Sequence, residues 1–162
     1  MTEAGGVEAR GTVVRAIAED DLPVWRELFR AYGVFYQTVF DEAQLDHVGA
    51  LLLAPDSGVD AFVAEDGAGR VIGFAHYRSH PDTFSTGRDW YLDDLFVAPD
   101  ARGQGIATAL IARLHEHAES VAPGGTLRWI TAADNARAQR VYDRVATRTS
   151  WVTYELRPGE EH

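Results

Sequence analysis

One stretch of the sequence constrains the fold more than any other: residues 95–107, LFVAPDARGQGIA. An apolar run leads into a turn with two glycines, and the turn opens directly into a segment with helical periodicity. A helix N-terminus leaves several backbone N–H groups unpaired and carries a partial positive charge, and glycines let an anion approach that backbone closely. Arg102 adds a side chain that can donate two parallel hydrogen bonds to a phosphate. The stretch therefore predicts a strand, an anion-binding turn and a helix, a site suited to a pyrophosphate.

Two common nucleotide-binding patterns fit this turn poorly. A P-loop needs a lysine followed by serine or threonine, and no lysine follows the glycines here. A dinucleotide-binding fingerprint that starts at Gly103 needs glycine or alanine at Thr108, and it belongs near the first strand of a parallel array. The turn instead follows the fourth expected strand.

The length and composition indicate one globular domain. The chain has 162 residues, of which 46% are hydrophobic and 25% charged, enough for a core of its own. The longest apolar run, residues 49–54, is far too short to span a membrane, and the first 30 residues lack the apolar core of a signal peptide. The absence of cysteine excludes disulfides, thiolate metal ligands and a cysteine nucleophile, and it fits a cytoplasmic location. We expect a flexible N-terminus at residues 1–11, the domain at 12–157 and a tail at 158–162.

The chain is acidic, with 25 Asp and Glu against 15 Lys and Arg and a net charge of −10. A general nucleic-acid binder needs a basic footprint, so no nucleic-acid partner is expected. An acidic field favours cationic partners such as amines. An alternative explanation of the same acidity is that it only keeps the protein soluble.

Periodicity and turn residues predict a mixed α/β sheet. Gly33 is expected to end the first helix, and Pro123 the third. In that third helix, Ile106, Leu110, Ile111 and Leu114 form an apolar stripe. The strands are expected at residues 12–17, 60–64, 70–77, 90–97, 126–131 and 150–156, and the helices at residues 20–32, 41–53, from the glycine turn to Pro123, and 134–145.

Two motifs together resemble those of a known family. The pattern Arg102-x-x-Gly105-x-Ala107 is similar to motif A of the GNAT superfamily of acetyl-CoA-dependent N-acetyltransferases, written [RQ]-x-x-G-x-[GA]. About thirty residues later, NARAQRVY at residues 135–142 resembles the family's N-x-x-A-x-x-x-Y helix. The resemblance implies a single-domain GNAT-like mixed sheet with helices on both faces. In detail the chain looks most like the small-amine and polyamine acetyltransferases, although Ala146 and Thr147 stand where the family commonly has a glycine and an aromatic residue.

The resemblance also implies acetyl-CoA as co-substrate, bound without a metal. Backbone N–H groups of residues 103–107 would hold the pyrophosphate, and the backbone of Leu95 and Val97 would pair with the pantetheine arm as an added strand does. The implied cofactor-binding residues are Leu95, Phe96, Val97, Arg102, Gly103, Gln104, Gly105, Ile106, Ala107 and Asn135.

Three residues are candidates for the chemistry. Tyr142 would act as a general acid that protonates the departing CoA thiolate, unless it is a core tyrosine. A carboxylate must accept a proton from the ammonium group before the amine attacks, and Asp93 and Asp94 are both placed for this. Adjacent strand residues point to opposite faces unless a β-bulge intervenes, so we name Asp93 first because it shares the face of Leu95 and Val97. Binding of the substrate's charge alone is an equally good interpretation of either carboxylate.

The first two expected helices carry acids and aromatics in the region that usually covers the acceptor in this family. Their combination suits an amine through charge and cation–π contact, although a solvated acidic helix explains each residue as well; they are Asp41, Glu42 and Asp46 with Tyr32, Phe35 and Tyr36. No histidine pattern typical of a metal site occurs, because His115 and His117 cannot share a helix face.

The sequence thus predicts an N-acetyltransferase that moves an acetyl group from acetyl-CoA to a small primary amine by direct attack in a ternary complex. Family members are often dimers, so the resemblance allows a homodimer, although the sequence does not give the oligomeric state. The alternatives are a protein lysine or N-terminal acetyltransferase, and a CoA-binding sensor without turnover. The altered Ala146 and Thr147 allow the sensor, whereas Tyr142 and Asp93 argue against it.

Overall fold

The computed structural model describes residues 11–159. A five-stranded mixed sheet has the order β1-β2-β3-β4-β5, in which the first four strands are antiparallel and β5 runs parallel to β4. The strands are β1 (Val13–Ala16), β2 (Asp60–Glu65), β3 (Val71–Pro81), β4 (Arg88–Val97) and β5 (Leu127–Arg128). The predicted mixed sheet is confirmed.

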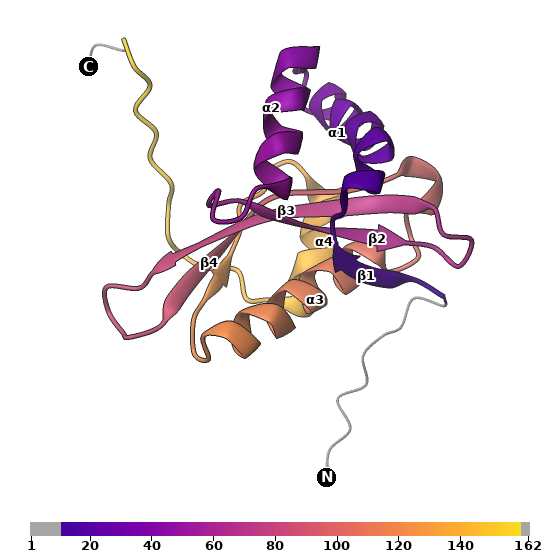
Figure 1. Ribbon diagram of the computed structural model, residues 1–162. Helices are drawn as coiled ribbons and strands as arrows, with labels where there is room; N and C mark the ends of the chain where they lie inside the picture. Colours follow the sequence, from indigo (N-terminus) through magenta and orange to yellow (C-terminus); the bar gives the residue numbers. More distant parts are fainter. Residues whose placement is uncertain (1–10, 160–162) are drawn as a thin grey trace. The chain divides into compact units, whose positions relative to one another are not determined.

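Helices cover both faces of this sheet (Figure 1). The first two pack on β2, β3 and β4 from one side, and the third crosses the opposite face. They are α1 (Leu22–Phe35), α2 (Glu42–Leu53) and α3 (Ile106–Val121), with short 3₁₀ turns at Glu19–Asp21 and Pro99–Ala101. Residues 131–159 form a second unit, which contains α4 (Ala136–Val145) followed by extended chain.

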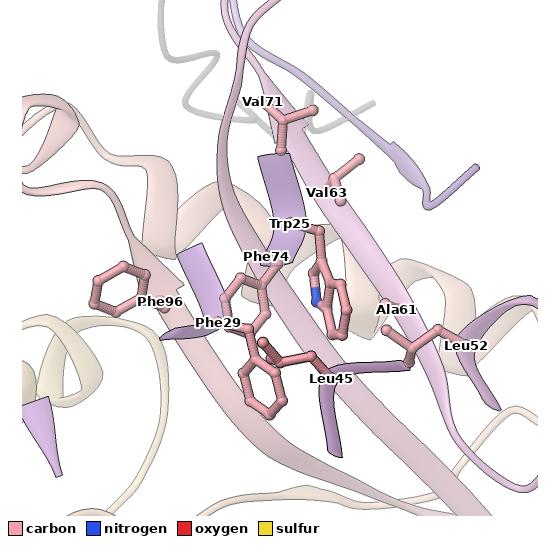
Figure 2. Close-up of a cluster of buried hydrophobic side chains, with 9 residues drawn as sticks. All are labelled: Trp25, Phe29, Leu45, Leu52, Ala61, Val63, Val71, Phe74 and Phe96. Atoms are coloured by element: carbon pink, nitrogen blue, oxygen red, sulfur yellow. The ribbon is translucent and has the colours of Figure 1, made fainter. Parts of the chain in front are cut away.

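The core on the α1 and α2 face is aromatic (Figure 2). Trp25 is fully buried and its ring lies 5.2 Å from that of Phe29, which meets Phe74 of β3 edge-on. Burial of such side chains contributes about 1.5–3 kcal/mol each. The cluster is completed by Leu45, Leu52, Ala61, Val63, Val71 and Phe96.

The opposite face is filled by α3. All four residues of the predicted stripe are buried, with exposed fractions of 0–5% for Ile106, Leu110, Ile111 and Leu114. Gly73 of β3 faces this helix, and a Cβ there would make ordinary contact with Ile106 and Leu110 at 3.5 Å but would lie only 2.9 Å from the backbone oxygen of Phe96. The amphipathic pattern therefore placed the correct face of α3 inward.

Gly33 does not end the first helix, as the sequence predicted; α1 continues to Phe35. The glycine is needed for space, because a Cβ there would lie 2.8 Å from the backbone oxygen of Thr38 and 2.9 Å from the ring of Phe40. The chain that leaves α1 folds back against this position. Glycine stands at this position because another part of the chain comes close to it, and not because the helix ends there.

The last two expected strands are also corrected. The strand expected at 126–131 is reduced to Leu127–Arg128, and residues 150–156 form no strand. Alternating apolar residues favour a strand, but a strand exists only where a partner supplies the hydrogen bonds. Within this described segment Trp151 and Tyr154 are 86% and 89% exposed. The expectation of a flexible N-terminus concerns residues 1–11, of which 1–10 lie outside the described residues, as do 160–162 of the expected tail.

Candidate active site

The glycine turn between β4 and α3 has the predicted form. Gly103 and Gly105 adopt φ angles of +79° and +80°, a region that glycine enters without strain. Apart from the neighbouring residues in the chain, no atom lies within 4 Å of a Cβ built on either glycine, so a side chain at either position would point into open space. Gly105 is the N-cap of α3 and provides no side-chain cap. The first N–H groups of this 16-residue helix are thus left for an anion.

Arg102 links this turn to the end of β4 through a hydrogen bond. Its Nε donates to the backbone oxygen of Val97 at 3.0 Å, and its guanidinium lies 5.3 Å from the ring centre of Phe96. The Nε donor is therefore engaged within the protein. A contact from the rest of the guanidinium to a phosphate stays a prediction.

The edge of β4 that faces β5 is paired over only part of its length. β5 pairs with β4 at Trp90 and Tyr91, whereas β3 pairs along the whole strand. Within residues 11–159, no strand pairs with that edge between Leu92 and Val97. An extended chain with amide groups, such as pantetheine, can bind there as an additional strand, and the edge ends at the glycine turn.

A β-bulge interrupts β4 beside this open edge. Tyr77 is paired with Leu92 and His76 with Asp94, so Asp93 is the extra residue. The Asp93 carboxylate accepts from Nε of Arg78 at 3.0 and 3.1 Å, and Arg78 lies on the same face of β3 as His76. The expectation that Asp93 shares the face of Leu95 and Val97 is therefore wrong. The bulge brings both carboxylates to the face covered by α1.

Asp94 is held by two donors on that face. The hydroxyl of Tyr32 donates to Oδ1 at 2.7 Å, and Nδ1 of His76 lies 2.9 Å from Oδ2. Burial alone would raise the pKa of Asp94, but the hydrogen bonds from His76 and Tyr32 outweigh it and the pKa is lowered. This carboxylate stays charged.

The pKa of Asp93 is shifted in the opposite direction. Burial raises the pKa of Asp93, and the neighbouring Arg78 offsets only part of this effect. Burial, followed by the nearby Asp94 charge, also raises the pKa of Tyr32, which therefore remains a neutral donor. Two adjacent carboxylates with separated pKa values are typical of a site where one holds charge and the other takes a proton.

The acids of the acceptor-covering region have partners of their own. Glu42 pairs with Arg26 and Arg30, and Asp46 pairs with Arg26. Asp41 caps α2 by accepting from the backbone N–H of Gln44 at 2.8 Å. These acids therefore serve the α1–α2 pair, and the hypothesis that they attract an amine loses its main support.

The aromatic residues of the same region remain accessible. Tyr36 and Phe35 are 49% and 56% exposed, with ring centres 5.0 Å apart, and Tyr36 lies 4.9 Å from Tyr32. These exposed rings therefore adjoin Tyr32, whose hydroxyl donates to Asp94.

The helix motif of the second unit has the predicted local structure. Asn135 is the N-cap of α4, and its side-chain oxygen accepts from the backbone N–H of Ala138 at 3.3 Å. Tyr142 lies two turns further along the same helix. The proposed roles of Asn135 toward the cofactor and of Tyr142 as an acid stay predictions.

Three residues near the carboxylates were not identified from the sequence: Trp25, His76 and Arg78. His76 was considered only as a metal ligand, although it stands in an apolar strand two residues after Phe74, on the face that such a strand buries. A polar residue at a core position must be hydrogen-bonded, and this signal could have found it. Among residues 11–159 no group of three or more His, Asp or Glu is arranged to hold a metal ion, and no helix is long and apolar enough to span a bilayer.

A bulged strand with an open edge, a glycine turn and a helix N-terminus thus follow one another in this chain. Comparison with known proteins identifies the family. The model of the acetyltransferase (GNAT) family matches residues 22–146. The chain therefore belongs to the GNAT family and is an acyl-CoA-dependent N-acetyltransferase.

Two relatives of known activity share substantial sequence with this chain. It is 32% identical over 146 residues to a D-amino-acid N-acetyltransferase of Saccharomyces cerevisiae, covering 88% of this chain and 89% of the relative. It is 30% identical over 124 residues to a phosphinothricin N-acetyltransferase of Alcaligenes faecalis, covering 74% of this chain and 59% of the relative.

Solved structures share the fold. A probable acetyltransferase superposes with a TM-score of 0.80 at 25% identity, covering 92% of this chain and 99% of the other. An aminoglycoside N-acetyltransferase in complex with CoA superposes with a TM-score of 0.74 at 22% identity, covering 91% and 95% of the two chains, and this likeness concerns the fold alone.

Proposed function

We propose that this protein transfers an acetyl group from acetyl-CoA to the primary amine of a small molecule by direct attack in a ternary complex. One observation carries the proposal: the β4 bulge brings Asp93 and Asp94 to one face, beside an open strand edge that ends at the glycine turn. A charge-binding site and an acyl-donor site thus adjoin each other.

Acetyl-CoA would bind along two features of the same segment. Its pyrophosphate would accept from the backbone N–H groups at residues 103–107, where the helix N-terminus supplies positive potential. Its pantetheine amides would pair with the edge of β4 at Leu95 and its neighbours, which leaves the thioester near the bulge.

The two carboxylates have different tasks in this proposal. Asp94 keeps its negative charge and attracts the ammonium group of the acceptor. Asp93, whose pKa is raised by burial, receives the proton that the amine must lose. The amine nitrogen then bonds to the thioester carbonyl carbon, the C–S bond breaks, and Tyr142 donates its proton to the leaving thiolate. The second proton that the nitrogen loses on becoming an amide nitrogen restores the neutral Tyr142 hydroxyl.

The acceptor class that fits best is a zwitterion with an amine and a carboxylate, such as an amino acid. Arg78 is half-exposed and adjoins Asp93, so a cation and an anion stand side by side. A polyamine, by contrast, carries no anionic group for Arg78 to bind. The similarity to an enzyme named for D-amino acids supports this choice.

A thiol-release assay with a panel of acceptors tests the proposal. The panel contains L- and D-amino acids, diamines, a lysine-containing peptide and a blank, each with acetyl-CoA. We expect release with amino acids above the blank, together with acetylated product by mass spectrometry. Turnover of the peptide alone would identify a protein acetyltransferase, and acetyl-CoA binding without release would identify a sensor. The homodimer and the cytoplasmic location stay predictions.

A further inference from the structure

Four side chains form a continuous hydrogen-bonded chain beneath the proposed acceptor site. The indole Nε1 of Trp25 lies 2.8 Å from Nε2 of His76, and Nδ1 of His76 lies 2.9 Å from Asp94, which Tyr32 reaches from the other side at 2.7 Å. The chain joins α1, β3 and the β4 bulge. Neither Trp25 nor His76 has a part in the acetyl transfer proposed above.

The chemistry of these groups permits only one arrangement of protons on the neutral histidine. An indole N–H donates and cannot accept, so Nε2 of His76 must offer its lone pair to Trp25. The ring proton then lies on Nδ1 and is donated to Asp94. A proton on Nε2 would place two N–H donors head to head at 2.8 Å.

The burial of these side chains keeps the hydrogen bonds running from Trp25 through His76 to Asp94. Trp25 is fully buried and His76 is 2% exposed, so no water replaces either partner. The ring of His76 is further confined by Phe74, stacked at a centroid distance of 4.5 Å, and by Phe29, edge-on at 5.1 Å. Asp94 is partly accessible. The Trp25–His76 end of the chain is thus sealed from solvent, whereas solvent reaches the Asp94 carboxylate.

We propose that His76, locked by Trp25 as the Nδ1–H tautomer, is a positioning residue that orients the Asp94 carboxylate toward the acceptor. It acts through Asp94 and touches neither the acceptor nor CoA. The proposal rests on the proposed function for the role of Asp94, whereas the tautomer lock depends on the four side chains alone.

Two substitutions of similar size separate the two hydrogen bonds of the ring. An asparagine places its amide nitrogen near the position of Nδ1, so His76→Asn keeps a donor for Asp94 and loses the hydrogen bond with Trp25. A glutamine extends to the position of Nε2, so His76→Gln keeps an acceptor for Trp25 and loses the hydrogen bond to Asp94. Both remove the aromatic ring, and each therefore controls for the loss of packing in the other.

Activity should follow the bond to Asp94. We expect His76→Gln to lower kcat by about 10- to 100-fold, the scale of a hydrogen bond to a charged group, with KM for acetyl-CoA nearly unchanged. His76→Asn should retain kcat within about 5-fold of the wild type. In an Asp94→Asn background, His76→Gln should cost little more, because both act through one carboxylate. Equal losses of kcat in the two variants, or fully additive losses with Asp94→Asn, would overturn the proposal.

Nitrogen-15 NMR of the histidine ring tests the lock without any activity measurement. The wild type should show a protonated Nδ1 and an unprotonated Nε2. The same pattern should persist in Asp94→Asn, because Trp25 alone still excludes a proton from Nε2. A protonated Nε2 in either protein contradicts the lock. If no amine is acetylated, the proposed function fails, and this spectrum still decides whether Trp25 sets the tautomer.

Discussion

The hydroxyl of Tyr32 donates to the Asp94 carboxylate at 2.7 Å, across 62 residues of sequence, and so ties the end of α1 to the bulge of β4. The same tyrosine packs against Phe29, Phe74 and Tyr36. The position of α1 over the site and the charge of Asp94 are therefore coupled through one side chain.

Removing this hydroxyl should raise the pKa of Asp94. Tyr32→Phe keeps the ring and its contacts but takes away one of the two donors that lower this pKa. A titration of the carboxyl carbon by NMR, compared with the wild type, measures the change. An unchanged titration would mean that His76 and the surrounding charges alone set the Asp94 pKa.

The glycine turn should lose its affinity for acetyl-CoA when a negative charge is introduced. Gly105→Asp adds a carboxylate beside the N–H groups that would hold the pyrophosphate, whereas Gly105→Asn adds a side chain of the same size without charge. Both variants bear the same strain at φ +80°, and asparagine and aspartate tolerate this region better than most residues. Calorimetry should show much weaker binding for the aspartate than for the asparagine variant. Equal affinities would argue against an anion site at this turn.

Tyr142→Phe tests the general acid. If the hydroxyl protonates the departing thiolate, kcat should fall by roughly 10²-fold, the lower end for acid–base catalysis, because a thiol of pKa about 8.5 leaves moderately well unaided. KM for acetyl-CoA should change much less. A kcat close to the wild type, with the chemical step shown to limit the rate, would leave Tyr142 as a packing residue.

Arg78 should distinguish acceptors that carry a carboxylate from those that do not. Arg78→Gln removes the cation beside Asp93, so kcat/KM for an amino acid should fall by roughly 10- to 100-fold. The same parameter for a simple amine should fall far less. Steady-state kinetics with an amino acid and its decarboxylated analogue measure the difference, and the same loss for both would contradict a zwitterionic acceptor.

A partly buried ion pair between β1 and the turn before α1 should make stability depend on pH. Arg15 donates to both oxygens of Asp21 at 2.7 and 2.8 Å, and this bond lowers the pKa of the buried Asp21 despite the opposing effect of burial. Because the pKa of Asp21 is lower in the folded state, its charge stabilises the fold at pH values above the unfolded-state pKa of about 3.9. This stabilisation is lost as the pH falls through the folded-state pKa.

Asp21→Asn removes this dependence. We expect the variant to be less stable at pH 7 by about 1 kcal/mol, the usual net contribution of a hydrogen bond, because Arg15 is partly exposed and keeps its ion pair with Glu65. The difference from the wild type should shrink as the pH falls below about 4. Urea unfolding at several pH values gives both numbers. A difference that is constant with pH would exclude the ion pair as its cause.

Local features of this chain were predictable, and features that depend on distant partners were not. The strand, glycine turn and apolar stripe of α3 follow from neighbouring residues, and the structure has them all. The pairing of Glu42 with Arg26 and Arg30 joins two helices and leaves no trace in the local pattern. Gly33 looked like a helix stop because the sequence does not show that Phe40 returns to it.

The site shows the same division. Asp93 and Asp94 were named from the sequence, but strict alternation assigned them to opposite faces. A bulge depends on the register between two strands, and register is a property of the pair. The roles of His76 and Trp25 were not predicted either, because their hydrogen bond joins residues that are 51 positions apart in the sequence.

The bulge also means that the number of carboxylates in the site is set by the length of β4 as well as by its residue types. Removing Asp93 would restore regular alternation between Leu92 and Asp94, whose partners Tyr77 and His76 are already consecutive. The sheet could then close without a break and keep the Asp94 network, but with a single acid and no counterion for Arg78. The charge that this site presents to an acceptor therefore depends on a single inserted residue in β4.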